Sequence, residues 1–176
     1  MEKTVCKLIP LTGMEWKGQM IRFGHSREQV NQILGAPDST WDNLGYYCGT
    51  ELRVEFDTHD RVKFIECLAG IDGGIQPEIY GVSAFETDAE ELLTILKREN
   101  NGPVDDSENG YSYAFLNTSV GVYREVTPEA VEEMVRELMN VELTALGHID
   151  LESENRRAHH WETIGIGEKD YYAHLR

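Results

Sequence analysis

The segment from residue 24 to residue 37 constrains the fold more than any other part of the chain, because it contains the start and stop signals of one short helix. Ser26 and Gln29 have the spacing of a capping box, in which the Ser26 hydroxyl accepts the Gln29 backbone N–H and the Gln29 side chain accepts the Ser26 N–H. The residues that follow at helical spacing form one apolar face: Val30, Ile33 and Leu34. Gly35 suits the closing turn, and Pro37 prevents the helix from resuming. We predict a short amphipathic helix that packs on other elements and carries no chemistry.

A β-hairpin is predicted after this helix, because apolar and charged residues alternate there. The apolar residues of its two strands are Leu52, Val54 and Phe56, then Val62, Phe64 and Ile65. The segment Asp57–Asp60 forms the turn between them. The aromatic stretch Trp41–Cys48 predicts a further strand. One apolar and one charged face are typical of a sheet that is covered on one side.

A similar order of elements follows the glycine-rich joint at residues 70–74. Residues 79–82 predict a short strand, and residues 87–90 have the spacing of a capping box that opens a second helix. Two antiparallel strands joined by a turn are expected over residues 111–115 and 120–123.

A third helix has a clear start, with Thr127 as its cap and Pro128 at its first position. The tail at residues 159–167 predicts a final strand. We therefore predict an α+β fold in one domain, residues 1–176, with helices packed on one face of one or more antiparallel sheets. Since both halves, 1–75 and 76–176, run helix, turn, then strands, two similar sub-halves are the alternative architecture.

The charge of the chain is strongly acidic and uneven. Up to Glu78 there are 12 acidic and 8 basic residues, and from Ile79 onward there are 20 acidic and 8 basic residues. Binding to nucleic acid requires the opposite sign, because its affinity comes from neutralising phosphates. The charge therefore favours a basic protein partner over a nucleic acid.

The cellular compartment is predicted from two features of the sequence, its apolar segments and its cysteines. Neither a signal sequence nor a membrane span is recognisable in the chain. Cys6, Cys48 and Cys67 are odd in number and lack CxxC spacing, which favours reduced thiols within a protein core. We expect a cytoplasmic protein that does not bind membranes.

The motifs of common enzymes and metal sites do not occur in the sequence. It contains no HExxH, no paired CxxC and no calcium-binding loop. Cys48 is the thiol best placed for exposure at a strand end, but nothing in the sequence orients a base toward it. We therefore expect no catalytic residue, no metal and no cofactor.

Aromatic and acidic residues are the candidates for contact with a partner. Tryptophan and tyrosine recur as anchors of protein interfaces, and three of them lie in or beside one predicted strand: Trp41, Tyr46 and Tyr47. The acidic candidates lie in the loop before the later strands and on the third helix: Asp105, Asp106, Glu108, Glu129, Glu132 and Glu133. Together they predict a surface that steers and binds a basic protein.

The chain resembles known protein families in two ways, one over its first part and one over its whole length. The Gly-x-Ser-x-x-Gln-Val-x-x-x-Leu-Gly-x-Pro pattern of residues 24–37, with the Val-x-Phe-Asp of the hairpin, resembles β-lactamase-inhibitor-like domains and small outer-membrane assembly lipoproteins. That resemblance covers about the first 70 residues and implies helices packed on an antiparallel sheet, which the inhibitors repeat in tandem. In its acidity and its Thr163–Gly167 tail, the whole chain is similar to bacterial immunity-type proteins, which implies neutralisation of a toxin without catalysis.

The leading hypothesis is a non-enzymatic inhibitor or immunity-type protein that binds a basic partner such as a toxin. The alternative is a small-ligand-binding protein or enzyme with a polar pocket between the sheet and the helices. A homo-oligomer that buries Trp41 and Tyr46 across a two-fold axis is also compatible with the sequence.

Overall fold

The helix predicted from residue 24 is confirmed in the computed structural model, which describes residues 2–140 and 150–176. Helix α1 spans Arg27–Leu34. The Gln29 N–H donates to the Ser26 hydroxyl at 3.2 Å, and the Ser26 N–H donates to the Gln29 side-chain oxygen at 2.8 Å. Gly35 closes the helix with a φ of 90°, a conformation that favours glycine. Of the apolar face, Val30 is fully buried.

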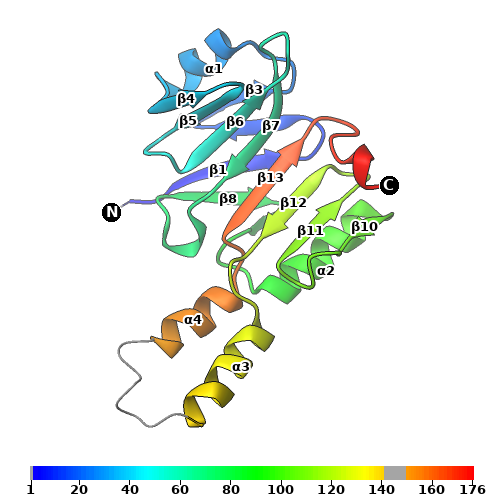
Figure 1. Ribbon diagram of the computed structural model, residues 1–176. Coiled ribbons are helices and arrows are strands. Elements are labelled where there is room, and N and C mark those ends of the chain that lie inside the picture. The colour runs from blue at the N-terminus through cyan, green and yellow to red at the C-terminus, as the bar shows by residue number, and fades with distance from the viewer. Residues whose placement is uncertain (1, 141–149) are drawn as a thin grey trace.

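The described part of the chain forms two β-sheets and four α-helices (Figure 1). The small sheet has the order β3-β2-β1-β8-β9 and consists of β1 (Thr4–Ile9), β2 (Gly13–Trp16), β3 (Gln19–Arg22), β8 (Ile75–Ile79) and β9 (Val82–Ser83). The large sheet has the order β10-β11-β12-β13-β7-β6-β5-β4. Its strands are β4 (Ser39–Trp41), β5 (Leu44–Tyr47), β6 (Leu52–Phe56), β7 (Val62–Cys67), β10 (Val104–Asp105), β11 (Ser112–Phe115), β12 (Val120–Tyr123) and β13 (Thr163–Gly167). Apart from the parallel pair β1 and β8, neighbouring strands are antiparallel, so the α+β prediction is confirmed.

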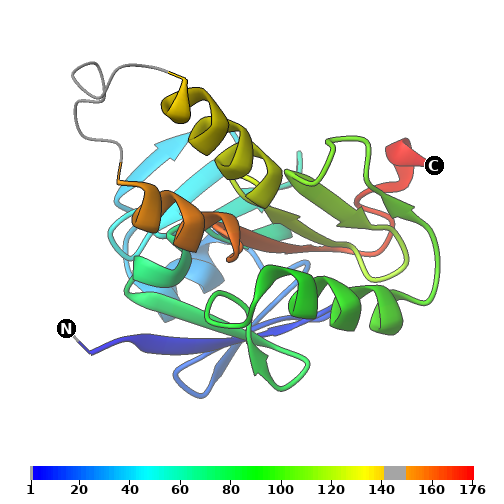
Figure 2. The ribbon, with the colours of Figure 1, turned by 90° about the horizontal axis from the view of Figure 1, so that it is seen from below.

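The core lies between the two sheets and under helix α2 (Ala89–Asn100). The sulfur atoms of Cys6 on β1 and Cys67 on β7 lie 4.0 Å apart within it, and both thiols are free and buried. Figure 2 shows the small sheet and α2 on the same side of the large sheet. Helices α3 (Pro128–Met139) and α4 (Leu151–Ala158) lie beyond the ends of β12 and β13 (Figure 1). In the described chain, the opposite face of the large sheet therefore has no α-helix packed over it.

We call that surface the open face of the large sheet. Strand register and alternation place on it one set of side chains from each strand. The set comprises Ser39, Trp41, Leu44, Tyr46, Arg53, Glu55, Phe64, Glu66, Asp105, Ser112, Ala114, Gly121, Tyr123, Thr163, Gly165 and Gly167.

Three predicted elements differ from the structure in their bounds. The stretch Trp41–Cys48 contains the end of β4, a turn in which Asp42 has a φ of 50°, and β5, because chain reversal needs a residue with positive φ there. Residues 79–82 do not form one strand: Ile79 ends β8, Val82 begins β9, and Tyr80 and Gly81 between them form a hairpin turn with φ of 51° and 80°. The last strand begins at Thr163, because helix α4 extends to Ala158.

The caps of the later helices were predicted with mixed success. For α3 the prediction is confirmed: the Thr127 hydroxyl accepts the Ala130 N–H at 3.2 Å. For α2 the predicted capping box is wrong. The cap is Asp88, whose carboxylate accepts the N–H groups of Glu90 and Glu91, because Asp88 directly precedes the first helical residue.

The two halves repeat an order of elements but interleave in space. Each half contributes strands to the small sheet, then one helix, then strands that run from an outer edge of the large sheet toward its centre. The two sets meet where β7 pairs with β13. Both sheets and the buried core therefore draw on both halves of the chain.

Candidate protein-binding surface

Two of the three predicted aromatic anchors lie on the open face. Trp41 sits on the edge strand β4 and is 71% exposed, an unusual exposure for a tryptophan. Tyr46 on β5 is half-buried and lies beside Arg53 of β6. The structure thus leaves both rings at one end of the open face.

The prediction that Tyr47 contacts a partner is wrong, because its side chain points into the core. Tyr47 has no exposed surface, and its hydroxyl donates to Asn31 Oδ1 of helix α1 at 2.8 Å. Burial raises the pKa of the Tyr47 phenol. Since neighbouring residues of a strand point to opposite faces, Tyr46 and Tyr47 could not share a surface.

The middle of the open face is covered by the end of the chain. Tyr171 stacks on Phe64 with 4.4 Å between ring centroids, and its hydroxyl donates to Glu55 at 2.7 Å. Tyr172 meets the same Phe64 ring edge-on at 6.2 Å. Three glycines make room for these rings, because a Cβ at each would clash with an aromatic side chain: Gly121, Gly165 and Gly167.

A cleft of about 300 Å³ lies between this aromatic cover and the 105–112 segment. Its lining includes three carboxylates, from Glu66, Asp105 and Glu108, and we call it the acidic cleft. None of the lining residues is a lysine, arginine or histidine. Tyr123, 43% exposed, forms part of its aromatic wall. The cleft therefore combines negative charge with an accessible ring.

Glu66 is a largely buried carboxylate of the cleft, with its side chain 16% exposed. Burial raises the pKa of its carboxyl, and the charge of Arg53, whose guanidinium lies 2.5 Å away, opposes that rise. Because burial prevails over Arg53, a further cation entering the cleft would stabilise the charged form of Glu66.

Two more of the predicted acidic residues lie near the same end of the large sheet. Burial raises the pKa of Tyr113, and the negative charges of Glu90, Asp106 and Glu129 raise it further against the opposing charge of Arg124. Asp106 and Glu129 are exposed, so they extend the negative potential around the end of β11.

Glu132 and Glu133 lie apart from the cleft lining. Both are exposed on the polar side of α3, opposite the residues that pack toward α4. The structure thus brings Asp105 and Glu108 together with Glu66, which sequence reasoning missed, and leaves Glu132 and Glu133 on a separate helix.

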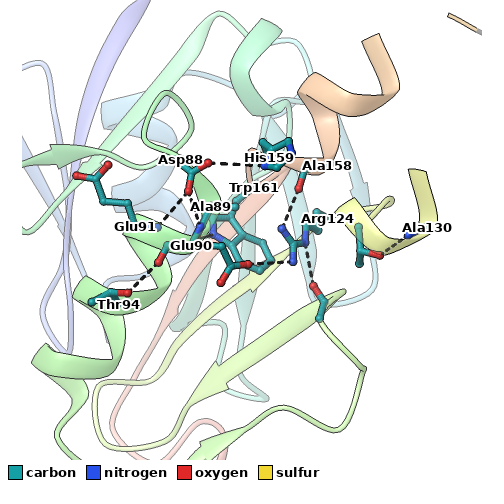
Figure 3. Close-up of polar contacts among 12 residues, drawn as sticks. Asp88, Ala89, Glu90, Glu91, Thr94, Arg124, Ala130, Ala158, His159 and Trp161 are labelled. Atoms are coloured by element: carbon teal, nitrogen blue, oxygen red, sulfur yellow. Dashed lines mark hydrogen bonds and ion pairs between the residues drawn. The ribbon is translucent and has the colours of Figure 1, made fainter. Parts of the chain in front are cut away.

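A buried arginine fixes the end of β12 beside this surface (Figure 3). Arg124 is 3% exposed, and its guanidinium donates to the carbonyl oxygens of Gly110 at 2.9 Å and Ala158 at 2.8 Å. It also lies 4.7 Å from the ring centre of Trp161, whose indole N–H donates to the Ala89 carbonyl. The arginine therefore ties β12, α2, α4 and the loop before β11 together.

The interface between α2 and the sheets is formed by buried apolar side chains. Leucines of α2 pack with aromatic and β-branched residues in one continuous buried cluster. Among residues 2–140 and 150–176, no three histidine, cysteine or acidic residues are arranged to hold a metal ion. No helix within the described ranges has the length and apolar character needed to cross a membrane.

Comparisons of the sequence with known protein families and curated proteins, and of the structure with solved structures, found no match.

Proposed function

We propose that this chain is a non-enzymatic binding protein of the inhibitor or immunity type, which neutralises a basic protein partner in the cytoplasm. The observation that carries the proposal is the acidic cleft within a sheet face that no α-helix of the described chain covers. A toxin that acts on an anionic substrate is the kind of partner whose basic surface would fit there.

Contact with the partner would begin at long range. The chain has a net charge of −16, and most of this charge lies in the half that forms the acidic cleft. A protein with a complementary potential would associate faster, and the rate would fall as salt screens the charges.

At short range, the cleft suits one lysine or arginine side chain of the partner. Asp105 and Glu108 would pair with its charge, while the ring of Tyr123 would offer a face for a cation–π contact. Trp41 lies on the same face at the far edge strand, where it would provide an apolar anchor. The two contacts would together span the open face.

The proposal is tested with the protein encoded beside this one in the source genome as the binding partner. We expect a salt-sensitive complex with the unmodified chain and a loss of affinity of about tenfold or more for the double variant Asp105→Lys, Glu108→Lys. The matched control is Glu91→Lys, Glu99→Lys, which changes the net charge equally but lies on α2, on the other side of the large sheet.

Three results are informative. An unchanged affinity in the Asp105→Lys, Glu108→Lys variant would contradict the proposed cleft, and so would an equal loss in the α2 control, which would indicate only net charge. The variant Glu132→Lys, Glu133→Lys tests whether the surface continues onto α3: a loss there as well would extend the binding surface beyond the sheet.

A further inference from the structure

The outer side of the small sheet is a second surface, independent of the open face. Figure 2 shows no helix of the described chain over it. Strand register places nine side chains on this outer side, and we call this set the small-sheet face: Val5, Lys7, Ile9, Glu15, Met20, Arg22, Gln76, Glu78 and Ser83. Val5 is 51% and Ile9 38% exposed, and Leu11 in the adjoining turn is 44% exposed.

A groove of about 430 Å³ lies at one end of this face, between the end of β1 and the β8–β9 turn. Ile9, Pro10 and Tyr80 contribute to its lining, together with the side chains of Lys7 and Glu78. The groove therefore has an apolar floor with one charge of each sign beside it.

The charges of the small-sheet face form a regular row. Lys7 of β1 has Glu78 of β8 beside it on one side and Glu15 of β2 on the other. Within residues 2–140 and 150–176, none of these three side chains forms an ion pair of 4.0 Å or shorter. The row can thus make its ion pairs with another molecule.

The face as a whole is electrically balanced. Lys7 and Arg22 offset Glu15 and Glu78, whereas the complete chain has a net charge of −16. Two copies of such an acidic chain repel each other over most of their surface, and a neutral apolar face is where that repulsion is weakest.

The row is also complementary to itself. When two copies meet face to face about a two-fold axis, a displacement of one strand, about 4.8 Å, puts Lys7 of each copy opposite Glu15 of the other. The two apolar side chains that flank Lys7 on β1, Val5 and Ile9, would then be buried in the same contact.

We propose that the small-sheet face is a homodimer interface, whose occupant is the same face of a second copy of this chain. Dimerisation would leave the open face of each copy free, because the two faces lie on opposite sides of the paired sheets (Figure 2). The dimer would then present two copies of the acidic cleft.

The test uses charge reversal followed by mixing, with mass measured by sedimentation and light scattering. We expect the unmodified chain to be a dimer at micromolar concentration. The Lys7→Glu variant has three negative charges in the row, and the double variant Glu15→Lys, Glu78→Lys has three positive charges there. Each variant alone should be monomeric, since like charges would face each other, and an equimolar mixture of the two should form a heterodimer.

The control is Lys97→Glu on α2, which makes the same change in net charge away from this face and should remain a dimer. Circular dichroism checks that each variant is folded. Any one of three results would overturn the proposal. The unmodified chain could be monomeric, the Lys7→Glu variant could still dimerise, or the folded Lys97→Glu variant could fail to dimerise. A monomeric chain that still binds its basic partner would refute this interface and leave the acidic cleft standing.

Discussion

Replacing Arg124 with methionine is expected to be among the most destabilising single changes in this protein. Methionine keeps much of the apolar stem but removes the guanidinium, so the carbonyl oxygens of Gly110 and Ala158 lose their donors. The ion pair with Glu90 adds little, because that carboxylate is 61% exposed and lies 3.5 Å away.

The magnitude follows from the lost contacts. A hydrogen bond to a charged group contributes about 1.5 to 3 kcal/mol, and a desolvated cation–π contact such as that of Arg124 with Trp161 about 2 kcal/mol. Burying the guanidinium costs free energy that offsets part of this gain. We therefore expect Arg124→Met to lower the free energy of unfolding by about 3 kcal/mol, because two carbonyl acceptors are left without a donor at about 1 to 3 kcal/mol each and the relief of the buried charge offsets part of that loss.

Urea unfolding measures this loss as a shift in the midpoint at constant slope, monitored by circular dichroism. Tryptophan fluorescence, to which the fully buried Trp161 contributes along with Trp16 and Trp41, is a second probe of the same transition. The matched control is Arg98→Met, because Arg98 is 67% exposed and, among the described residues, its ion pair is with its neighbour Glu99, so its removal should cost less than about 0.5 kcal/mol. A loss below about 1 kcal/mol for Arg124→Met would refute our assignment of this residue as a structural tie.

Two further predictions concern the aromatic cover of the open face. Gly165→Ala should lower the free energy of unfolding by about 1 to 3 kcal/mol in the same assay, because the added Cβ would lie 2.3 Å from the Phe64 ring. Adding Phe64→Leu to that variant should restore part of the loss. If the losses of the two single variants simply add in the double variant, the predicted clash is contradicted. The protein should also lose stability as the pH rises above about 10, since burial raises the pKa of Tyr171 and Tyr172 above that of unfolded tyrosine, so the unfolded chain releases those protons first. Urea midpoints at pH 8 and above pH 10 should differ less in the Tyr171→Phe, Tyr172→Phe variant than in the unmodified chain, and an equal difference would be evidence against buried phenols.

The parts of the fold that could be predicted are those whose interactions close within a few residues. The caps of α1 and α3 satisfy backbone donors three positions away, so Ser26 and Thr127 specify those helix starts locally. The Asp57–Asp60 turn joins two strands that are adjacent in the chain. The α+β class followed from the alternation of these helical and strand signals.

The faces of the strands were less predictable, because a single extra residue changes them. Phe64 follows Val62 by two positions and was expected on the same apolar face. A bulge beside Glu55 and Phe56 leaves Lys63 as an extra residue, so Val62 points into the core and Phe64 to the open face, where Tyr171 covers it. Nothing near Phe64 in the sequence indicates that cover.

The sequence by itself determined the local starts of the helices, the hairpin and the excess of acidic residues in the second half of the chain. Only the tertiary structure decided which residues share a surface. The acidic cleft joins Glu66, Asp105 and Glu108 because strands β7 and β11 are brought close by β12 and β13, which lie between them in the sheet. Those contacts join distant parts of the chain, and their geometry depends on strand order and register, which local patterns do not encode.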